Sequence, residues 1–154
     1  MTGDRSVENT VRQIFQARNV AVLTTHGEDY PHACLVAIAV TDDLRTIVFN
    51  TSRSTRKYSN ISNNNRVTLL VDDRSHGEED FHQATVVTAR GRALEIPVEK
   101  SSLLLNLFLQ HHPYLKNFVQ SPTSVLLGVQ VESYAVVSRF QNVLILNLDD
   151  ENHR

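Results

Sequence analysis

The stretch from Phe49 to Val71 reads FNTSRSTRKYSNISNNNRVTLLV, and its pattern decides the prediction for the whole chain. It begins as a strand, passes through a Ser/Thr-rich turn, and continues into a helix that carries Arg56 and Lys57 in its first turn. The free N–H groups of a helix N-terminus bind anions, and Ser and Thr hydroxyls add further donors. The stretch therefore predicts an anion-binding site between a strand and a helix.

Three cations, Arg53, Arg56 and Lys57, stand near the start of this predicted helix. Cations are disfavoured at the positive end of a helix dipole, so an anion that neutralises them would explain their presence. Arginine also offers a forked contact that matches a phosphate group. The alternative interpretation is a solvated basic turn, because short basic stretches are common on protein surfaces. The residues by themselves leave both interpretations open.

Outside this stretch, the hydrophobic pattern predicts short strands and a few helices. Apolar residues at helical spacing predict a helix from about residue 7 to Arg18-Asn19, and Pro97 begins another that runs through the leucine-rich segment 101–109. Segment 72–83 is charged and is expected to be a loop. Strands are predicted for residues 20–25, 32–40, 45–50, 66–71, 84–96, 125–137 and 142–148.

The arrangement of these strands follows from their spacing and composition. Short turns join the first three, which predicts an antiparallel meander. Segment 32–40 is nearly all apolar, as a strand covered on both faces would be. Gly91 interrupts another strand and indicates a bulge or bend. We expect one domain over residues 1–154, mainly β with peripheral helices, in a closed or partly closed antiparallel barrel.

Composition excludes several classes of protein. The 154 residues carry a formal net charge of −2, which argues against a nucleic-acid-binding protein with a basic face. The longest apolar run, residues 33–40, is far shorter than the roughly 20 residues needed to cross a bilayer. The first residues lack the apolar segment of a secretory signal, so we expect a cytoplasmic protein with no membrane partner. A single cysteine, Cys34, excludes an internal disulfide.

Several short motifs are weak signals by themselves, but their order along the chain makes the combination more specific. The strand end Phe49-Asn50-Thr51 is followed by Arg56-Lys57 and then by residues 63–69, NNNRVTL. The preceding strand begins with residues 31–37, PHACLVA, and a later one carries residues 90–93, RGRA. These pieces, over roughly residues 8 to 96, resemble the FMN-binding split barrels of the pyridoxamine 5′-phosphate oxidase-like family.

This resemblance implies an antiparallel split β-barrel that forms a homodimer and holds FMN at the subunit interface. Arg56 and Lys57 would contact the phosphate, with Thr51 and Ser52 adding hydroxyl or amide bonds. The strand from Cys34 to Ala37 would lie along the isoalloxazine ring and use backbone groups on its pyrimidine edge. The implied cofactor-binding residues are Cys34, Leu35, Val36, Ala37, Asn50, Thr51, Ser52, Arg56 and Lys57.

The sequence also departs from the oxidase that gives the family its name. That oxidase carries an arginine near the position of Cys34 and a lysine near that of Ala39, and both are missing here, as is its C-terminal Arg-x-His element. We therefore expect an FMN-dependent oxidoreductase acting on a different small molecule. No catalytic side chain is assigned, because the flavin carries the chemistry. The alternatives are a non-catalytic flavin- or haem-binding module and a haem-degrading relative.

Histidines and the lone cysteine offer competing sites. His111-His112 follow the leucine-rich helix and fit either a metal or haem ligand pair or a polar helix end, which favours histidine. His76 and His82 lie in the acidic loop, but their spacing matches no defined metal site, so no metal is predicted. Cys34 in an apolar strand is expected to be a buried small hydrophobe rather than a redox thiol.

Overall fold

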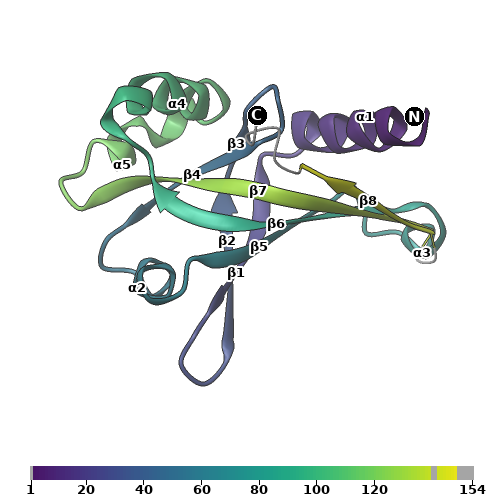
Figure 1. Ribbon diagram of the computed structural model, residues 1–154, viewed down its shortest axis with the longest axis horizontal. Helices are drawn as coiled ribbons and strands as arrows, with labels where there is room; N and C mark the ends of the chain where they lie inside the picture. Colours follow the sequence, from purple (N-terminus) through teal and green to yellow (C-terminus); the bar gives the residue numbers. More distant parts are fainter. Residues whose placement is uncertain (1, 140–141, 149–154) are drawn as a thin grey trace, which may run out of the picture.

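The computed structural model describes residues 2–139 and 142–148, and its strands form an eight-stranded antiparallel sheet curled into a half-barrel (Figure 1). Hydrogen-bonded neighbours follow the order β2-β1-β5-β6-β7-β4-β3, with β8 paired to β7. The predicted mainly β fold with a partly closed antiparallel barrel is confirmed. The strands are β1 (Val20–His26), β2 (Pro31–Ala37), β3 (Ala39–Val40), β4 (Thr46–Ser52), β5 (Arg66–Asp72), β6 (Thr85–Glu95), β7 (Ser124–Ser138) and β8 (Asn142–Asn147).

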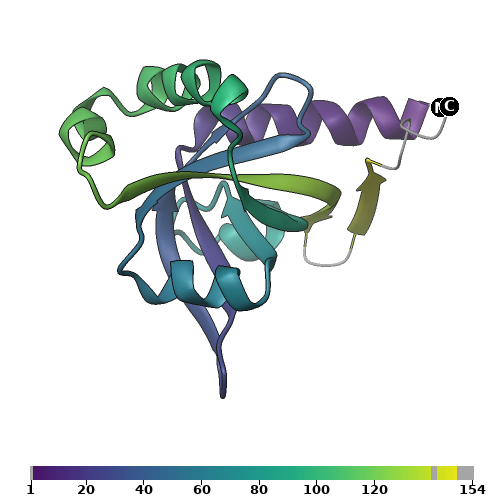
Figure 2. The same ribbon diagram turned by 60° about the vertical axis from the view of Figure 1, so that its left-hand side comes forward.

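Helices lie around the sheet rather than between its strands. In both views α1 and α4 run along one end of the half-barrel, whereas α2 and the tip of the β1–β2 hairpin lie at the other (Figures 1 and 2). The segment 72–83, predicted as a loop, contains the one-turn helix α3. The helices are α1 (Thr2–Ala17), α2 (Arg56–Asn63), α3 (Asp80–Gln83), α4 (Val98–His111), the 3-10 helix η1 (Pro113–Leu115) and α5 (Lys116–Val119).

The predicted single strand 32–40 is wrong, because the chain breaks it at Ile38. The N–H of Ile38 donates to the carbonyl of Asn19 at 2.9 Å, so this buried residue stays with β1. The next residue, Ala39, already pairs with Val48 of β4. β2 and β3 therefore stand at opposite ends of the strand order, and the predicted three-strand meander is wrong at its centre. The junction at Ile38 instead closes one end of the barrel.

The predicted irregularity at Gly91 is confirmed. Arg90 pairs with Ser133 of β7 but Gly91 pairs with Val131, so Glu132 is the extra residue of a bulge. A Cβ atom on Gly91 would lie 2.1 Å from the carbonyl oxygen of Gln130. Only glycine allows β6 and β7 to approach so closely at this point.

The core fills the concave side of the sheet beneath α1. The predicted apolar stripe of this helix, Val7, Val11, Ile14 and Phe15, is buried. The Phe15 ring meets the Tyr134 ring edge-on at 5.9 Å between centroids. The Tyr134 hydroxyl donates to the carbonyl of Leu44 at 2.6 Å, and burial raises the pKa of that tyrosine. A second cluster packs Leu104 and Phe108 of α4 against Val48 of β4.

Candidate functional site

Local hydrogen bonds order the turn between β4 and α2. Thr55 is the N-cap of α2, and its side-chain oxygen accepts a hydrogen bond from the N–H of Tyr58 at 3.3 Å. The same hydroxyl donates to the carbonyl of Ser52 at 2.8 Å and lies 3.1 Å from the hydroxyl of the buried Thr51. The side chain of Ser52 accepts from the N–H of Ser54 at 3.3 Å. The turn is therefore held in place without any ligand.

The three cations of this turn have different partners. Arg53 forms an ion pair with Glu95 of β6 at 2.6 Å and donates to the Tyr58 hydroxyl at 2.8 Å. Hydrogen bonds from Arg53 and Tyr58 lower the pKa of Glu95. Within the described residues, neither Arg56 nor Lys57 has a carboxylate within ion-pair distance. Two of the three predicted cations thus remain available to an anion, and the third has a structural partner.

β2 is an edge strand. It pairs with β1 along its whole length and with no other described strand, so its other edge presents unpaired backbone N–H and C=O groups. The expectation that this segment is covered on both faces is wrong, because the Leu35 side chain is 73% exposed. Val36 is buried and Cys34 half-buried, on the opposite face from Leu35.

The positive charge of Lys57 in α2 acts on the thiol of Cys34 in β2. Burial raises the pKa of the Cys34 thiol, and the positive charge of Lys57 partly opposes that rise. Lys57 therefore lies close enough to Cys34 to influence its ionisation. A raised pKa favours the thiol over the reactive thiolate, in line with the expected role of Cys34 as a small hydrophobe.

A pocket of about 390 Å³ separates α2 from the β1–β2 hairpin. Arg56, Ser59 and Asn60 line one side, and His32 lines the other. The Nδ1 atom of His32 is buried but has no hydrogen-bond partner, which is costly unless a ligand or water satisfies it. From its place at the start of a strand, His32 is interpreted as a strand-entry residue, with contact to the flavin or substrate as the alternative; its place opposite Arg56 depends on how the hairpin and α2 pack in the fold.

The structure brings together five of the nine implied cofactor-binding residues in one segment. Asn50, Thr51 and Ser52 end β4, and Arg56 and Lys57 begin α2. Cys34 lies near this segment, because the positive charge of Lys57 acts on its thiol. Ala37 is half-buried and directly precedes Ile38. Leu35 and Val36 point to opposite faces of β2, so only their backbone atoms could meet the same ligand. Asn50 is already engaged, since its side-chain oxygen accepts a hydrogen bond from Ser124.

The paired histidines differ in their surroundings. His112 is fully buried, and its Nε2 atom donates to the carbonyl of Ile38 at 2.8 Å. Its Nδ1 atom lies 3.0 Å from the Tyr114 hydroxyl, so both ring nitrogens are occupied. His111 is exposed, and its Nδ1 atom lies 3.0 Å from the carbonyl of Leu107. The two histidines do not form a joint ligand pair in this structure.

The convex face of the sheet is apolar along one row of paired residues. The register runs from Leu35 through Val22, Leu70 and Thr88 to Ala135 and Ile145. Leu35 and Ile145 are exposed at the ends of this row. Toward the hairpin, the next rows carry Thr24, Thr68 and Arg90, and then His26, Arg66 and Arg92. The convex face therefore changes from apolar to cationic across its width.

None of the described helices is long and apolar enough to cross a membrane. A family model described as pyridoxamine 5′-phosphate oxidase matches residues 7–137. No curated protein matches the chain at a significant level.

Solved structures share the fold at low sequence identity. A heme binding protein from Mycobacterium smegmatis superposes with a TM-score of 0.79 at 16% identity, covering 88% of this chain and 55% of that protein. An FAD-binding protein from Mesorhizobium loti gives 0.67 at 16% identity, covering 83% and 91%. A putative pyridoxamine 5′-phosphate oxidase from Listeria innocua gives 0.62 at 19% identity, covering 92% and 98%. The chain thus spans about half the length of the first of these proteins.

Proposed function

Because the chain belongs to the pyridoxamine 5′-phosphate oxidase family, we propose that it is an FMN-dependent oxidoreductase acting on a small molecule. The observation that carries the proposal is the pair Arg56 and Lys57. Both stand in the first turn of α2 without a carboxylate partner among the described residues. Two uncompensated cations at a helix N-terminus are stabilised by a bound phosphate.

The residues present fit FMN on their chemistry. Arg56 and Lys57 bind the phosphate, and the hydroxyl-rich turn ahead of them supports its oxygens. The unpaired backbone edge of β2 offers alternating donors and acceptors, which orient the pyrimidine edge of a flavin. When bound, the flavin supplies hydride or electron transfer, which needs no catalytic side-chain pair.

The substrate differs from that of the pyridoxamine phosphate oxidase itself. Cys34 of β2 and Ala39 of β3 stand near the positions where that oxidase has an arginine and a lysine. Without these two cations, this part of the chain lacks the positive charges that the oxidase carries there. The substrate is therefore a small molecule recognised by other groups.

A homodimer completes the proposed site. The convex row that begins at Leu35 leaves apolar side chains exposed, and apolar surface of this kind is stabilised by burial against a second subunit. Light scattering after gel filtration is expected to give twice the chain mass. Leu35→Asp should shift the protein toward the monomer, because it places a charge at an exposed end of the apolar row.

The decisive test removes the two free cations. Arg56→Ala/Lys57→Ala should weaken FMN binding at least about a hundredfold, since charge-assisted hydrogen bonds contribute roughly 1.5–3 kcal/mol each. Isothermal calorimetry and the flavin absorbance retained through gel filtration measure the effect. Arg5→Ala/Lys100→Ala removes the same charge from exposed positions of α1 and α4 and should leave binding unchanged. Equal FMN affinity in both double variants would overturn the phosphate assignment.

Haem binding is the second candidate function, favoured by the likeness to a heme binding protein. His112 is unsuited to ligate iron, because both its ring nitrogens are occupied. The exposed His111 is the better candidate ligand of the pair. A Soret band on haem titration that is lost in His111→Ala, together with no affinity for FMN, would favour haem over flavin.

A further inference from the structure

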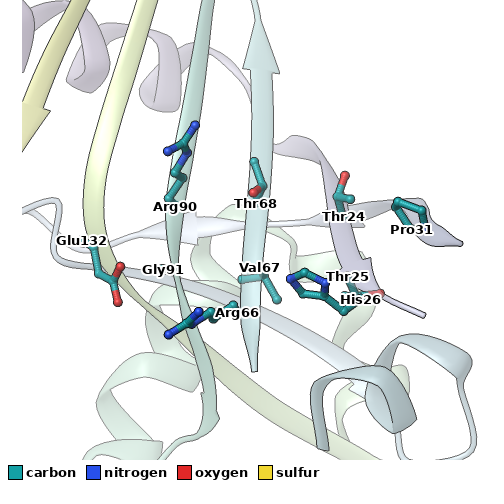
Figure 3. Close-up of a pocket in the computed structure, with 10 residues that line it drawn as sticks. All are labelled: Thr24, Thr25, His26, Pro31, Arg66, Val67, Thr68, Arg90, Gly91 and Glu132. Carbon is teal, nitrogen blue, oxygen red and sulfur yellow. The ribbon is translucent and has the colours of Figure 1, made fainter. Parts of the chain in front are cut away.

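A second cationic cluster lies on the convex face of the sheet. A pocket of about 340 Å³ opens there over β1, β5 and β6, lined on its polar side by Thr24, Thr68, Arg66 and Arg90 (Figure 3). In the close-up, the two arginines reach out from neighbouring strands on either side of Gly91. Pro31 is a wall both of this pocket and of the hairpin pocket that Arg56 lines, but the two pockets share no charged residue.

The strand register forces the arginines together. Arg66 stands directly opposite Arg92 in the β5–β6 ladder, and Arg90 stands opposite Thr68. Like charges that face each other across a ladder are destabilising, so three arginines on two adjacent strands carry an energetic cost. Such a cost is removed when an anion binds between them.

One carboxylate neutralises part of the positive charge of these three arginines. Glu132 forms an ion pair with Arg92 at 3.2 Å. The bulge opposite Gly91 makes Glu132 an extra residue of β7 and puts it at the rim of the pocket. Among the described residues, Arg66 and Arg90 have no carboxylate within ion-pair distance. The pocket therefore has a net positive charge in addition to the Arg92–Glu132 pair.

Hydroxyl groups supply the remaining recognition elements. Thr24 and Thr68 face each other across the β1–β5 ladder, and both side chains line the pocket. Thr68 neighbours Arg90 across the β5–β6 ladder, and Thr24 follows it on β1. Guanidinium and hydroxyl groups that line one pocket together match the oxygens of a doubly charged acidic group. A neutral or cationic ligand would leave the arginines uncompensated.

We propose that this pocket binds the doubly charged acidic group of a small molecule, a phosphate monoester or a dicarboxylate. Arg66 and Arg90 hold the charge, Thr24 and Thr68 donate hydrogen bonds, and Glu132 limits the affinity by repelling the anion. The proposal does not rest on FMN binding, because none of these residues belongs to the turn at Arg56 and Lys57.

NMR titration of the arginine Nε–Hε signals tests the proposal residue by residue. The protein carrying Arg56→Ala/Lys57→Ala is titrated separately with inorganic phosphate and with succinate, so that binding at the α2 turn does not contribute. The signals of Arg66 and Arg90 are expected to shift saturably with at least one of the two anions, which identifies the acidic group. The signal of Arg53, already paired with Glu95, should barely move.

Two substitutions are expected to act in opposite directions. Arg90→Gln should weaken anion binding at least tenfold, whereas Glu132→Gln should strengthen it several-fold by removing the nearby negative charge. Arg74→Gln, on an exposed residue outside the pocket, is the control. Shifts that do not saturate, or affinities equal in Arg90→Gln and in the control, would overturn the proposal. So would loss of FMN retention in Arg90→Gln alone, since the pocket would then belong to the flavin site.

Discussion

The turn at residues 52–57 and the convex-face pocket are built from the same ingredients in different ways. Each lies in a cluster of three cations, and in each cluster a glutamate neutralises one of them, Glu95 for Arg53 and Glu132 for Arg92, which stands opposite the pocket residue Arg66. The turn gathers its cations within one short segment. The pocket gathers them from two strands whose pairing brings distant residues side by side. Charge gathered in one segment can therefore be recognised in a sequence, whereas charge assembled by strand register depends on the fold.

The largest expected effect comes from breaking the register that assembles the pocket. Gly91→Ala would place a Cβ atom 2.1 Å from the backbone oxygen of Gln130, so β6 and β7 would have to separate. We expect a loss of about 3 kcal/mol or more in the free energy of unfolding, measured by urea denaturation.

Gly77→Ala is the matched control for this loss. A Cβ atom there would meet only the Ser75 side chain at 3.6 Å, so stability should change by less than about 0.5 kcal/mol. If both glycine variants proved equally stable, the close approach at the bulge would not hold the convex-face arginines in register.

A smaller effect is expected from disturbing the turn at Thr55, because the substitution removes only the contacts of one capping side chain. Thr55→Ala removes the N-cap of α2 and should cost about 1 kcal/mol of stability. It should also weaken FMN binding, since the capped helix start positions Arg56 and Lys57. Thermal unfolding and FMN calorimetry measure the two consequences.

Ser62→Ala is the control within the same helix, at an exposed position outside the hairpin pocket. Alanine is the better helix former, so stability should be unchanged or slightly raised. Weaker FMN binding in Ser62→Ala than in Thr55→Ala would contradict the idea that the cap organises the site.

The smallest effect concerns Arg53, the cation of the turn that Glu95 neutralises. The pKa of Glu95 is lowered by its hydrogen bonds to Arg53 and Tyr58, so its ionised form stabilises the folded state above the ordinary value of 4.5. This contribution disappears as the pH falls through the lowered pKa. The stability of the wild type and of Glu95→Gln should therefore converge in acid, as measured by urea unfolding between about pH 2 and 7.

Salt provides the second check on this pair. Both side chains of the Arg53–Glu95 pair are about half exposed, so added salt should shrink the difference between wild type and Glu95→Gln. A difference that is independent of both pH and salt would mean that Glu95 acts through packing rather than through its charge.

The sequence predicted the parts of the fold that depend on neighbouring residues. Strand positions, the helix after Thr55 and the bulge at Gly91 all follow from patterns a few residues long. The break at Ile38 could not be predicted, because residues on both sides are apolar and β-compatible. The hydrogen bond from Ile38 to Asn19 still continues the ladder with β1, and the strand ends because the next residue, Ala39, pairs with Val48 of β4, a partner that the local pattern does not reveal.

The same distinction applies to the candidate site, where some residues could be predicted from the local sequence and others depended on the fold. Arg56 and Lys57 could be proposed from their position after a hydroxyl-rich turn, but the engagement of Arg53 by Glu95 required the fold. The same holds for His32, whose unpartnered ring nitrogen faces a pocket formed by a separate helix. The apolar composition of β2 suggested burial, yet Leu35 is exposed because β2 ends the sheet.

The hydrogen bond between His112 and Ile38 joins residues 74 positions apart. During synthesis, the whole turn from Ser52 to Lys57 leaves the ribosome well before His112 does. The junction at the end of β2 cannot reach its final form until that histidine arrives. The turn waits longer still, because the N–H of Arg53 donates to the carbonyl of Thr123 and Ser52 pairs with Ser124 of β7. In the proposed flavoprotein, a growing chain therefore completes the strand that holds the ring and the turn that holds the phosphate only after these later residues are made.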